Sequence, residues 1–225
     1  MSDPVVMSGK DSPPADYLKS THYIESRAKQ IVKIASGFSG LDAVKKAIAL
    51  FEFVRDHIKY DPYCAMDPPE MYRATMVLKN RKGYCVQKAV LLAALGRAAG
   101  IPTRLGFADV RNHKTPAALL EIMGTNLFVF HGYVEFWIKN KWIKATPAFD
   151  RETARKAGAL LVELDGEHDA VFHPVDPYGQ PHIEYVNYRG VYSDLPIQEI
   201  IAVFKETYGE GNPSTTGHSG SGEDA

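Results

Sequence analysis

The spacing of hydrophobic and polar residues divides the chain into a helical first part and an extended second part. Apolar residues recur at helical intervals in three early segments, residues 24–34, 42–60 and 71–78. A nearly continuous apolar run then begins at Cys85 and stops before Gly100 and Pro102, two residue types that end helices. A helix that is apolar on almost every side is typically buried, so we expect the helix beginning at Cys85 to be central.

Beyond Pro102 the pattern becomes that of β-strands. The clearest strand is predicted for residues 127–138, and Lys139-Asn140 predicts a two-residue turn into a partner strand over residues 141–145. The other expected elements are strands over 103–110, 160–164 and 183–186, a short helix or irregular loop over 117–123, a helical turn over 151–158 and a closing helix over 196–208. Helices followed by strands indicate an α+β fold, with the Cys85 helix packed on an antiparallel sheet.

Length and composition narrow the class of protein. The chain has 225 residues and a formal net charge of -1, which suits one domain over residues 17–208 between flexible tails, residues 1–16 and 209–225. The near-zero charge and the lack of long basic runs argue against a nucleic-acid partner. Because no uncharged apolar run approaches the ~18 residues of a membrane span and no secretory signal is visible, we expect a soluble, cytoplasmic protein without a membrane partner.

The two cysteines, Cys64 and Cys85, form no Cys-x-x-Cys pair and no close cluster with histidine. The sequence therefore predicts neither a metal site nor a cofactor. Cys64 has no helix-start context and is interpreted as a packing residue.

Cys85 has the sequence context of a nucleophile. At a helix start it would lie among unpaired backbone N–H groups at the positive end of the helix dipole, which favours a thiolate and can receive an oxyanion. His131 falls within the clearest strand, and Asp150 lies just beyond its hairpin partner. A cysteine, a histidine and a carboxylate in this order suggest a nucleophile, a base and an orienting acid.

Three stretches, FVRDHIKYDPY, LKNRKGYCVQKAVLLAALGRAAGIPTR and HGYVEFWIKNKWIKATPAFD, carry a family resemblance. The chain resembles the transglutaminase-like superfamily, whose papain-like core uses a Cys-His-Asp triad. Its cysteine motif is matched by Gly83, Cys85, Arg97, Ala98, Gly100, Ile101, Pro102 and Arg104, and its histidine motif by His131, Tyr133, Glu135 and Trp142. The resemblance covers residues 51–150 and implies cysteine chemistry with Cys85 and His131 in the catalytic roles.

One position departs from the family pattern. Where the superfamily has an acid before a proline, four residues after the hairpin tryptophan, this chain has Thr146 before Pro147. Residue 148 should lie opposite His131 across the hairpin, so Thr146 and Asp150 flank that point on one face. We assign Asp150 as the orienting acid because it carries the charge, with Thr146 as a neutral substitute.

Three further residues are candidates for substrate or oxyanion binding. Tyr84 and Gln87 flank the nucleophile, and Tyr60 lies in one of the matched stretches. Each of the three is also explained by an ordinary structural role.

The sequence thus predicts a cysteine enzyme that cleaves a peptide, protein or small amide through a thioester. Hydrolysis is favoured over transglutaminase-type transfer to an amine. Acyl transfer to a small arylamine and a non-catalytic binding module remain alternatives, and the sequence leaves the oligomeric state open.

Overall fold

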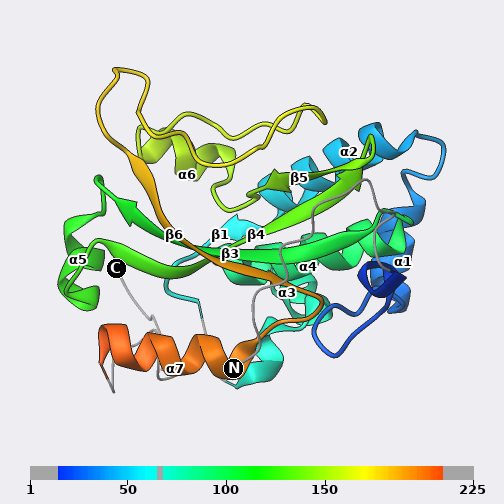
Figure 1. Cartoon of the computed structure of the whole chain (residues 1–225), viewed down its shortest axis with the longest axis horizontal. Helices are drawn as coiled ribbons and strands as arrows, with labels where there is room; N and C mark the ends of the chain where they lie inside the picture. Colours follow the sequence, from blue (N-terminus) through cyan, green and yellow to red (C-terminus); the bar gives the residue numbers. More distant parts are fainter. Residues whose placement is uncertain (1–14, 65–67, 210–225) are drawn as a thin grey trace, which may run out of the picture.

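The computed structural model describes residues 15–64 and 68–209, which form a helical layer and an antiparallel sheet (Figure 1). The sheet has the strand order β5 (Lys141–Ala145), β4 (Leu127–Ile138), β3 (Thr103–Asn112), β6 (Ile183–Tyr192). The helical part before it consists of η1 (Ala15–Leu18), α1 (Lys29–Ser36), α2 (Ala43–His57), η2 (Pro69–Tyr72), α3 (Ala74–Asn80) and α4 (Cys85–Ala98). Among the described residues, no helix is both long and apolar enough to cross a membrane. The predicted tails, residues 1–16 and 209–225, lie almost wholly outside the described residues.

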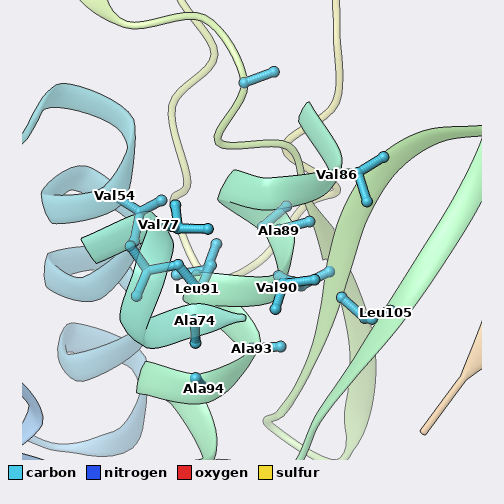
Figure 2. Close-up of a cluster of buried hydrophobic side chains, with 14 of the residues drawn as sticks. Val54, Ala74, Val77, Val86, Ala89, Val90, Leu91, Ala93, Ala94 and Leu105 are labelled. Atoms are coloured by element: carbon cyan, nitrogen blue, oxygen red, sulfur yellow. The ribbon is translucent and has the colours of Figure 1, made fainter. Parts of the chain in front are cut away.

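The helix that begins at Cys85 is the centre of the fold, as its composition predicts. Residues Val86 to Arg97 are all buried, and α4 packs against α1, α2 and α3 as well as against β3 and β4. Figure 2 shows valine, alanine and leucine side chains of α4 between Val54 and Val77 of the helical layer and Leu105 of the sheet. Gly100 has φ +80°, the left-handed conformation that glycine adopts without steric cost beyond a helix end.

The central hairpin of the sheet agrees with the sequence pattern residue for residue. β4 spans Leu127–Ile138 and β5 spans Lys141–Ala145, with Val134 opposite Ala145. Lys139 and Asn140 between them have φ values of 51° and 59°, the backbone of a tight hairpin turn. Continuing this register past the end of β5 puts residue 148 opposite His131, as expected.

β3 (Thr103–Asn112) and β6 (Ile183–Tyr192) complete the sheet. The β3–β4 pairing shifts between Ala108, which is opposite His131, and Val110, which is opposite Phe128. Phe130 takes up the extra residue with φ 53°, so β4 carries a bulge immediately before His131. Three helices follow the strands in sequence or interrupt them: α5 (Ala117–Met123), α6 (Arg151–Lys156) and α7 (Ile197–Tyr208). In Figure 1, α6 and the yellow segment that leads to β6 lie above the sheet, and α7 lies below it.

Two predicted elements differ in extent, since the helix expected over 71–78 is η2 followed by α3 and the strand expected over 183–186 continues to Tyr192, and two others were wrong. α1 begins at Lys29 rather than near residue 24, because the carboxylate of Glu25 is held by Arg73 and by the N–H of Thr75 in an irregular segment. Residues 160–164 form no strand. The buried Arg55 guanidinium donates to the carbonyl oxygen of Val162 at 3.0 Å, so a side chain takes the place of a neighbouring strand.

A short parallel pair, β1 (Lys59–Tyr60) with β2 (Lys82–Gly83), was not predicted. Tyr60 pairs with Gly83, two residues before Cys85, so this pair carries Tyr60 to the start of α4. Two-residue strands are too short to leave a periodic pattern in a sequence.

Candidate active site

Cys85 is the first residue of α4, and the helix start is built by its neighbours. Gln87 accepts a hydrogen bond from the N–H of Tyr84 at 3.2 Å, which satisfies one of the donors at the helix end. Burial raises the pKa of the Cys85 thiol to about 11, while the backbone N–H groups of Gly132, Val86 and Cys85 itself act to lower it. The expected stabilisation of a thiolate by helix-start N–H groups is therefore present, but burial outweighs it.

Gly132 brings β4 against the start of α4. A Cβ atom at this position would lie 2.8 Å from Cα of Val86, too close for two backbone segments to accept, and 3.3 Å from the carbonyl oxygen of Cys85, which is a tight contact. Because strand N–H groups point along the sheet and β5 stops at Ala145, the amide of Gly132 faces the sulfur from an unpaired edge of β4. The sequence analysis did not single out Gly132, although a glycine inside a strand indicates close backbone approach.

His131, the residue before Gly132, is buried against aromatic rings. Its imidazole lies 5.1 Å from the ring of Phe172 and 6.1 Å from that of Tyr185, measured between centroids. Burial lowers the pKa of His131 to about 3, and no carboxylate among the described residues offsets this effect. At pH 7 the thiol and the imidazole are therefore both neutral in this conformation.

Cys85 and His131 border the same cavity, whose volume is about 420 Å³. This volume is in the usual range for small-ligand sites. Most of the wall is apolar and comes from three regions, represented by Leu119 of α5, Phe128 of β4 and Phe172 before β6. No hydrogen bond joins the thiol to the imidazole among the described residues. In catalytic pairs without a bound substrate this hydrogen bond is often long or absent, so its absence does not exclude the pair.

A second, smaller cavity of about 50 Å³ also touches Cys85 and His131. Phe204 and Tyr208 of α7 close it. The Tyr208 hydroxyl accepts from the N–H of Val129 at 2.8 Å and donates to the carbonyl oxygen of Leu127 at 3.1 Å, which holds α7 on β4.

The three substrate-binding or oxyanion candidates differ in whether they border a cavity. Tyr60 borders both cavities and has the most suitable position, and burial followed by the charge of Cys85 raises its pKa well above the ordinary value. Tyr84 borders the smaller cavity, where its hydroxyl donates to that of Tyr72 at 3.0 Å.

Gln87 does not border either cavity in the described structure. Its Oε1 atom accepts from Cys64 and Tyr84, and its Nε2 atom donates to the carbonyl oxygen of Met71. These contacts assign Gln87 to the helix start and to Cys64, so its predicted oxyanion role has no geometric basis here. Cys64 is buried and is not joined to Cys85 by a disulfide, as its interpretation as a packing residue requires.

Asp150 is not paired with His131. Its carboxylate caps α6 by accepting from the N–H of Thr153 at 2.8 Å and from the Thr153 hydroxyl at 3.0 Å, and it also accepts from the N–H of Tyr60 at 2.8 Å. The predicted contact is therefore absent from the described structure, because the carboxylate is occupied by a helix end and by β1. An aspartate three residues before a threonine at a helix start is an N-cap pattern that the sequence analysis did not use for this residue.

Thr146, the neutral substitute, is buried behind the site. It lies just past the end of β5, is 1% exposed, and its hydroxyl has no hydrogen-bond partner among the described residues. It borders neither cavity in the described structure, so it cannot contact a substrate there.

Replacing Asp150 with asparagine tests its role as a cap. Burial acts to raise the pKa of Asp150, but hydrogen bonds from Tyr60 and Thr153 outweigh it and lower the pKa. A lowered pKa means stability that is present above the unfolded value of about 4 and is lost as the pH falls through the folded value. We expect Asp150→Asn to lose about 1 kcal/mol of unfolding free energy at pH 7 and less below pH 4, measured by urea unfolding. The pH dependence of Cys85 alkylation should not move, whereas an orienting acid would shift it.

Residues 32–147 match the family model described as transglutaminase-like superfamily. The fold is similar to that of a candidate cysteine protease from Cytophaga hutchinsonii, at 17% identity and a TM-score of 0.45, over 78% of this chain and 53% of that one. It is also similar to the periplasmic domain of TgpA from Pseudomonas aeruginosa, at 19% identity and a TM-score of 0.40, over 61% of this chain and 48% of that one.

The chain thus spans about half the length of these two solved structures. A search of curated proteins finds no match. The family model covers just over half of the 225 residues and includes the cysteine helix, the histidine strand and the hairpin. By this match, and with an α+β core that agrees with it, the chain belongs to the transglutaminase-like superfamily.

Proposed function

We propose that this protein is a cysteine-dependent amide hydrolase in which Cys85 is the nucleophile and His131 the base. The observation that carries the proposal is that the thiol at the start of α4 and the imidazole on β4 border the same cavity of about 420 Å³. The imidazole would take the thiol proton as sulfur attacks the carbonyl carbon, and would deliver it to the departing amine nitrogen. Water would then resolve the thioester, releasing the acid and the free thiol.

The oxyanion that forms during attack needs hydrogen-bond donors. The N–H groups near the sulfur, those of Val86 and Gly132 among them, are suited to this role because they are fixed by the α4–β4 contact. The phenol of Tyr60 is the side-chain candidate on the same cavity.

The size of the smaller cavity supports water rather than a bulky amine as the second reactant. A volume of about 50 Å³ has room for water molecules but not for a lysine side chain delivered by another protein. Transfer to an amine is the second candidate reaction, and an amine that approached Cys85 through the smaller cavity would require α7 to move away from β4.

The larger cavity supports an amide with an apolar acyl group as substrate, whether in a peptide, a protein or a small molecule. We expect Leu119→Trp, which places an indole in this cavity, to lower kcat/KM for bulky apolar acyl groups about tenfold, mainly through KM. The control is Leu120→Trp, since Leu120 is 42% exposed and borders neither cavity in the described structure. Steady-state kinetics on acyl p-nitroanilides of increasing size would measure the difference, and equal losses for both variants would contradict the assignment.

Trapping the thioester tests the proposed function directly. The wild-type protein would be mixed with activated acyl esters and peptidyl anilides, quenched in acid and analysed by intact and peptide mass spectrometry. We expect an acyl adduct on Cys85 that is lost in Cys85→Ala and kept in Cys64→Ala, the only other cysteine of the chain. An adduct on Cys64, or none with any substrate class, would count against an amide hydrolase.

A non-catalytic module with a transglutaminase-like fold is the alternative from another class, and one observation favours it: no carboxylate among the described residues acts on His131. Alkylation by iodoacetamide across pH separates the two. A catalytic Cys85 should lose much of its reactivity when His131 is replaced, whereas an inert one should not respond. We propose the cytoplasm as the location, because a reducing compartment keeps thiols such as those of Cys64 and Cys85 free of disulfides.

A further inference from the structure

The imidazole of His131 has one nitrogen without a role in the proposed reaction. Nε2 is fully buried and has no hydrogen-bond partner among the described residues. Since His131 borders the cavity together with Cys85 and Nε2 is buried away from solvent, we assign Nδ1 as the nitrogen that takes the thiol proton. Nδ1 can accept the thiol proton only in the tautomer that carries a hydrogen on Nε2, and a buried N–H without an acceptor is costly. A group behind the ring must therefore be available to Nε2.

A second buried polar atom without a partner lies near the same end of the hairpin. It is Oγ1 of Thr146, at the position where the superfamily has an acid before proline. Among the described residues three buried polar side-chain atoms have no partner, the third being Nε2 of His182, and because buried polar groups are nearly always satisfied each needs an explanation.

Tyr185 of β6 connects the two. Its ring packs edge-on against His131 at 6.1 Å between centroids. Burial raises the pKa of Tyr185, and the nearby Thr146 side chain acts to lower it, so the two hydroxyl groups are neighbours although their geometry falls short of a hydrogen bond. The Tyr185 oxygen accepts from the N–H of Phe172 at 3.3 Å, which keeps the phenol in the segment that covers His131.

We propose that the hydroxyl groups of Thr146 and Tyr185, which are not hydrogen-bonded to Nε2 in this structure, close on it as a neutral anchor and accept the Nε2–H of His131 in place of a carboxylate. The inference deepens the proposed function and rests on it only for the identity of His131 as the base. A hydroxyl anchor fixes the tautomer and the ring orientation, as an acid does, but adds no negative charge to stabilise the imidazolium. Thr146 and Tyr185 are thus positioning residues that act on the substrate through His131.

Nuclear magnetic resonance of the imidazole nitrogens tests the anchor without any substrate. We expect the Nε2–H tautomer in the wild-type protein and a mixture of tautomers in Tyr185→Phe and in Thr146→Val. Tyr188→Phe is the matched control, because Tyr188 stacks on Tyr185 at 5.9 Å but is 57% exposed. Two variants at separate positions keep the test decisive if one of them fails to fold. A wild-type Nδ1–H tautomer, or an unchanged tautomer in both variants, would overturn the anchor.

Thr146→Asp tests the anchor in the other direction, because it supplies the negative charge that the two hydroxyl groups lack. A carboxylate near Nε2 should raise the pKa of His131 by about 1–3 units and extend Cys85 alkylation to lower pH. The other titratable groups around the two cavities are Cys85, Tyr60, Tyr84, Tyr208, Lys114 and Lys156. Repeating the titration in Cys85→Ala removes the nearest of them, and a histidine pKa that does not respond to Thr146→Asp would reject the proposal.

The hydroxyl anchor and the amide hydrolase can be rejected by different results. An Nε2–H tautomer that depends on Tyr185, in a protein that forms no acyl adduct, would support the anchor and reject the hydrolase. An acyl adduct on Cys85 with a tautomer indifferent to Tyr185 would do the reverse.

Discussion

His131→Asn is expected to lower kcat/KM for amide hydrolysis by about 10²–10⁴-fold, the usual contribution of a positioned general base. The expected loss is large because burial raises the Cys85 pKa to about 11, so few thiols are ionised at pH 7 without a base. Asparagine keeps a polar side chain of similar length but cannot take the thiol proton. The measurement is kcat/KM as a function of pH, with the rate rising steeply toward high pH in the variant as hydroxide replaces the base.

A second buried histidine provides the control. His182 is 2% exposed and its Nε2 also has no hydrogen-bond partner, yet it borders neither cavity in the described structure. His182→Asn should change the unfolding free energy to a similar degree while leaving kcat/KM within about twofold, as expected for a side chain outside the site. Equal losses of activity in the two variants would show that His131 supports the fold rather than the reaction.

The elements that carry the nucleophile and the base could be predicted closely because local signals agree there. Cys85 starts a helix with strong propensity, and Gly100 ends it with positive φ. The hairpin of β4 and β5 has β-branched and aromatic strands around Lys139-Asn140, and its bounds match the prediction. Arg104 and Glu135, both matched to the family motifs, form a cross-strand ion pair, with Nε of Arg104 2.7 Å from the carboxylate. Part of each motif therefore supports the sheet rather than the chemistry.

The partner of His131 could not be predicted because it depends on contacts between distant parts of the chain. Asp150 has the right charge and a plausible register, but its carboxylate is taken by Thr153 three residues later and by the backbone of Tyr60, 90 residues earlier. Tyr185 belongs to a strand beyond the matched family region, which ends at residue 147. Sequence periodicity indicates which face of a strand is buried, but not which strand from elsewhere covers it.

Gly132→Ala is expected to be the most damaging of the conservative substitutions at the site. The added Cβ would lie 2.8 Å from Cα of Val86. Because this contact joins the backbones of β4 and α4, no side chain can turn aside and the two elements must separate. Overpacking of this kind costs about 1–3 kcal/mol of unfolding free energy. The same displacement moves the thiol away from the imidazole and from the amide of Gly132, so activity should fall by more than the loss of stability explains.

The matched control is Gly40→Ala, because a Cβ at Gly40 meets no atom within 4 Å and the residue does not have a positive φ. That variant should be as stable as the wild type or slightly more so, since alanine restricts the unfolded chain. Urea unfolding and the rate of Cys85 alkylation would be measured for both variants at a temperature where each is fully folded. If Gly132→Ala unfolds and reacts like Gly40→Ala, the close contact between the start of α4 and β4 does not hold the site together, and the positions of both catalytic side chains must have another cause.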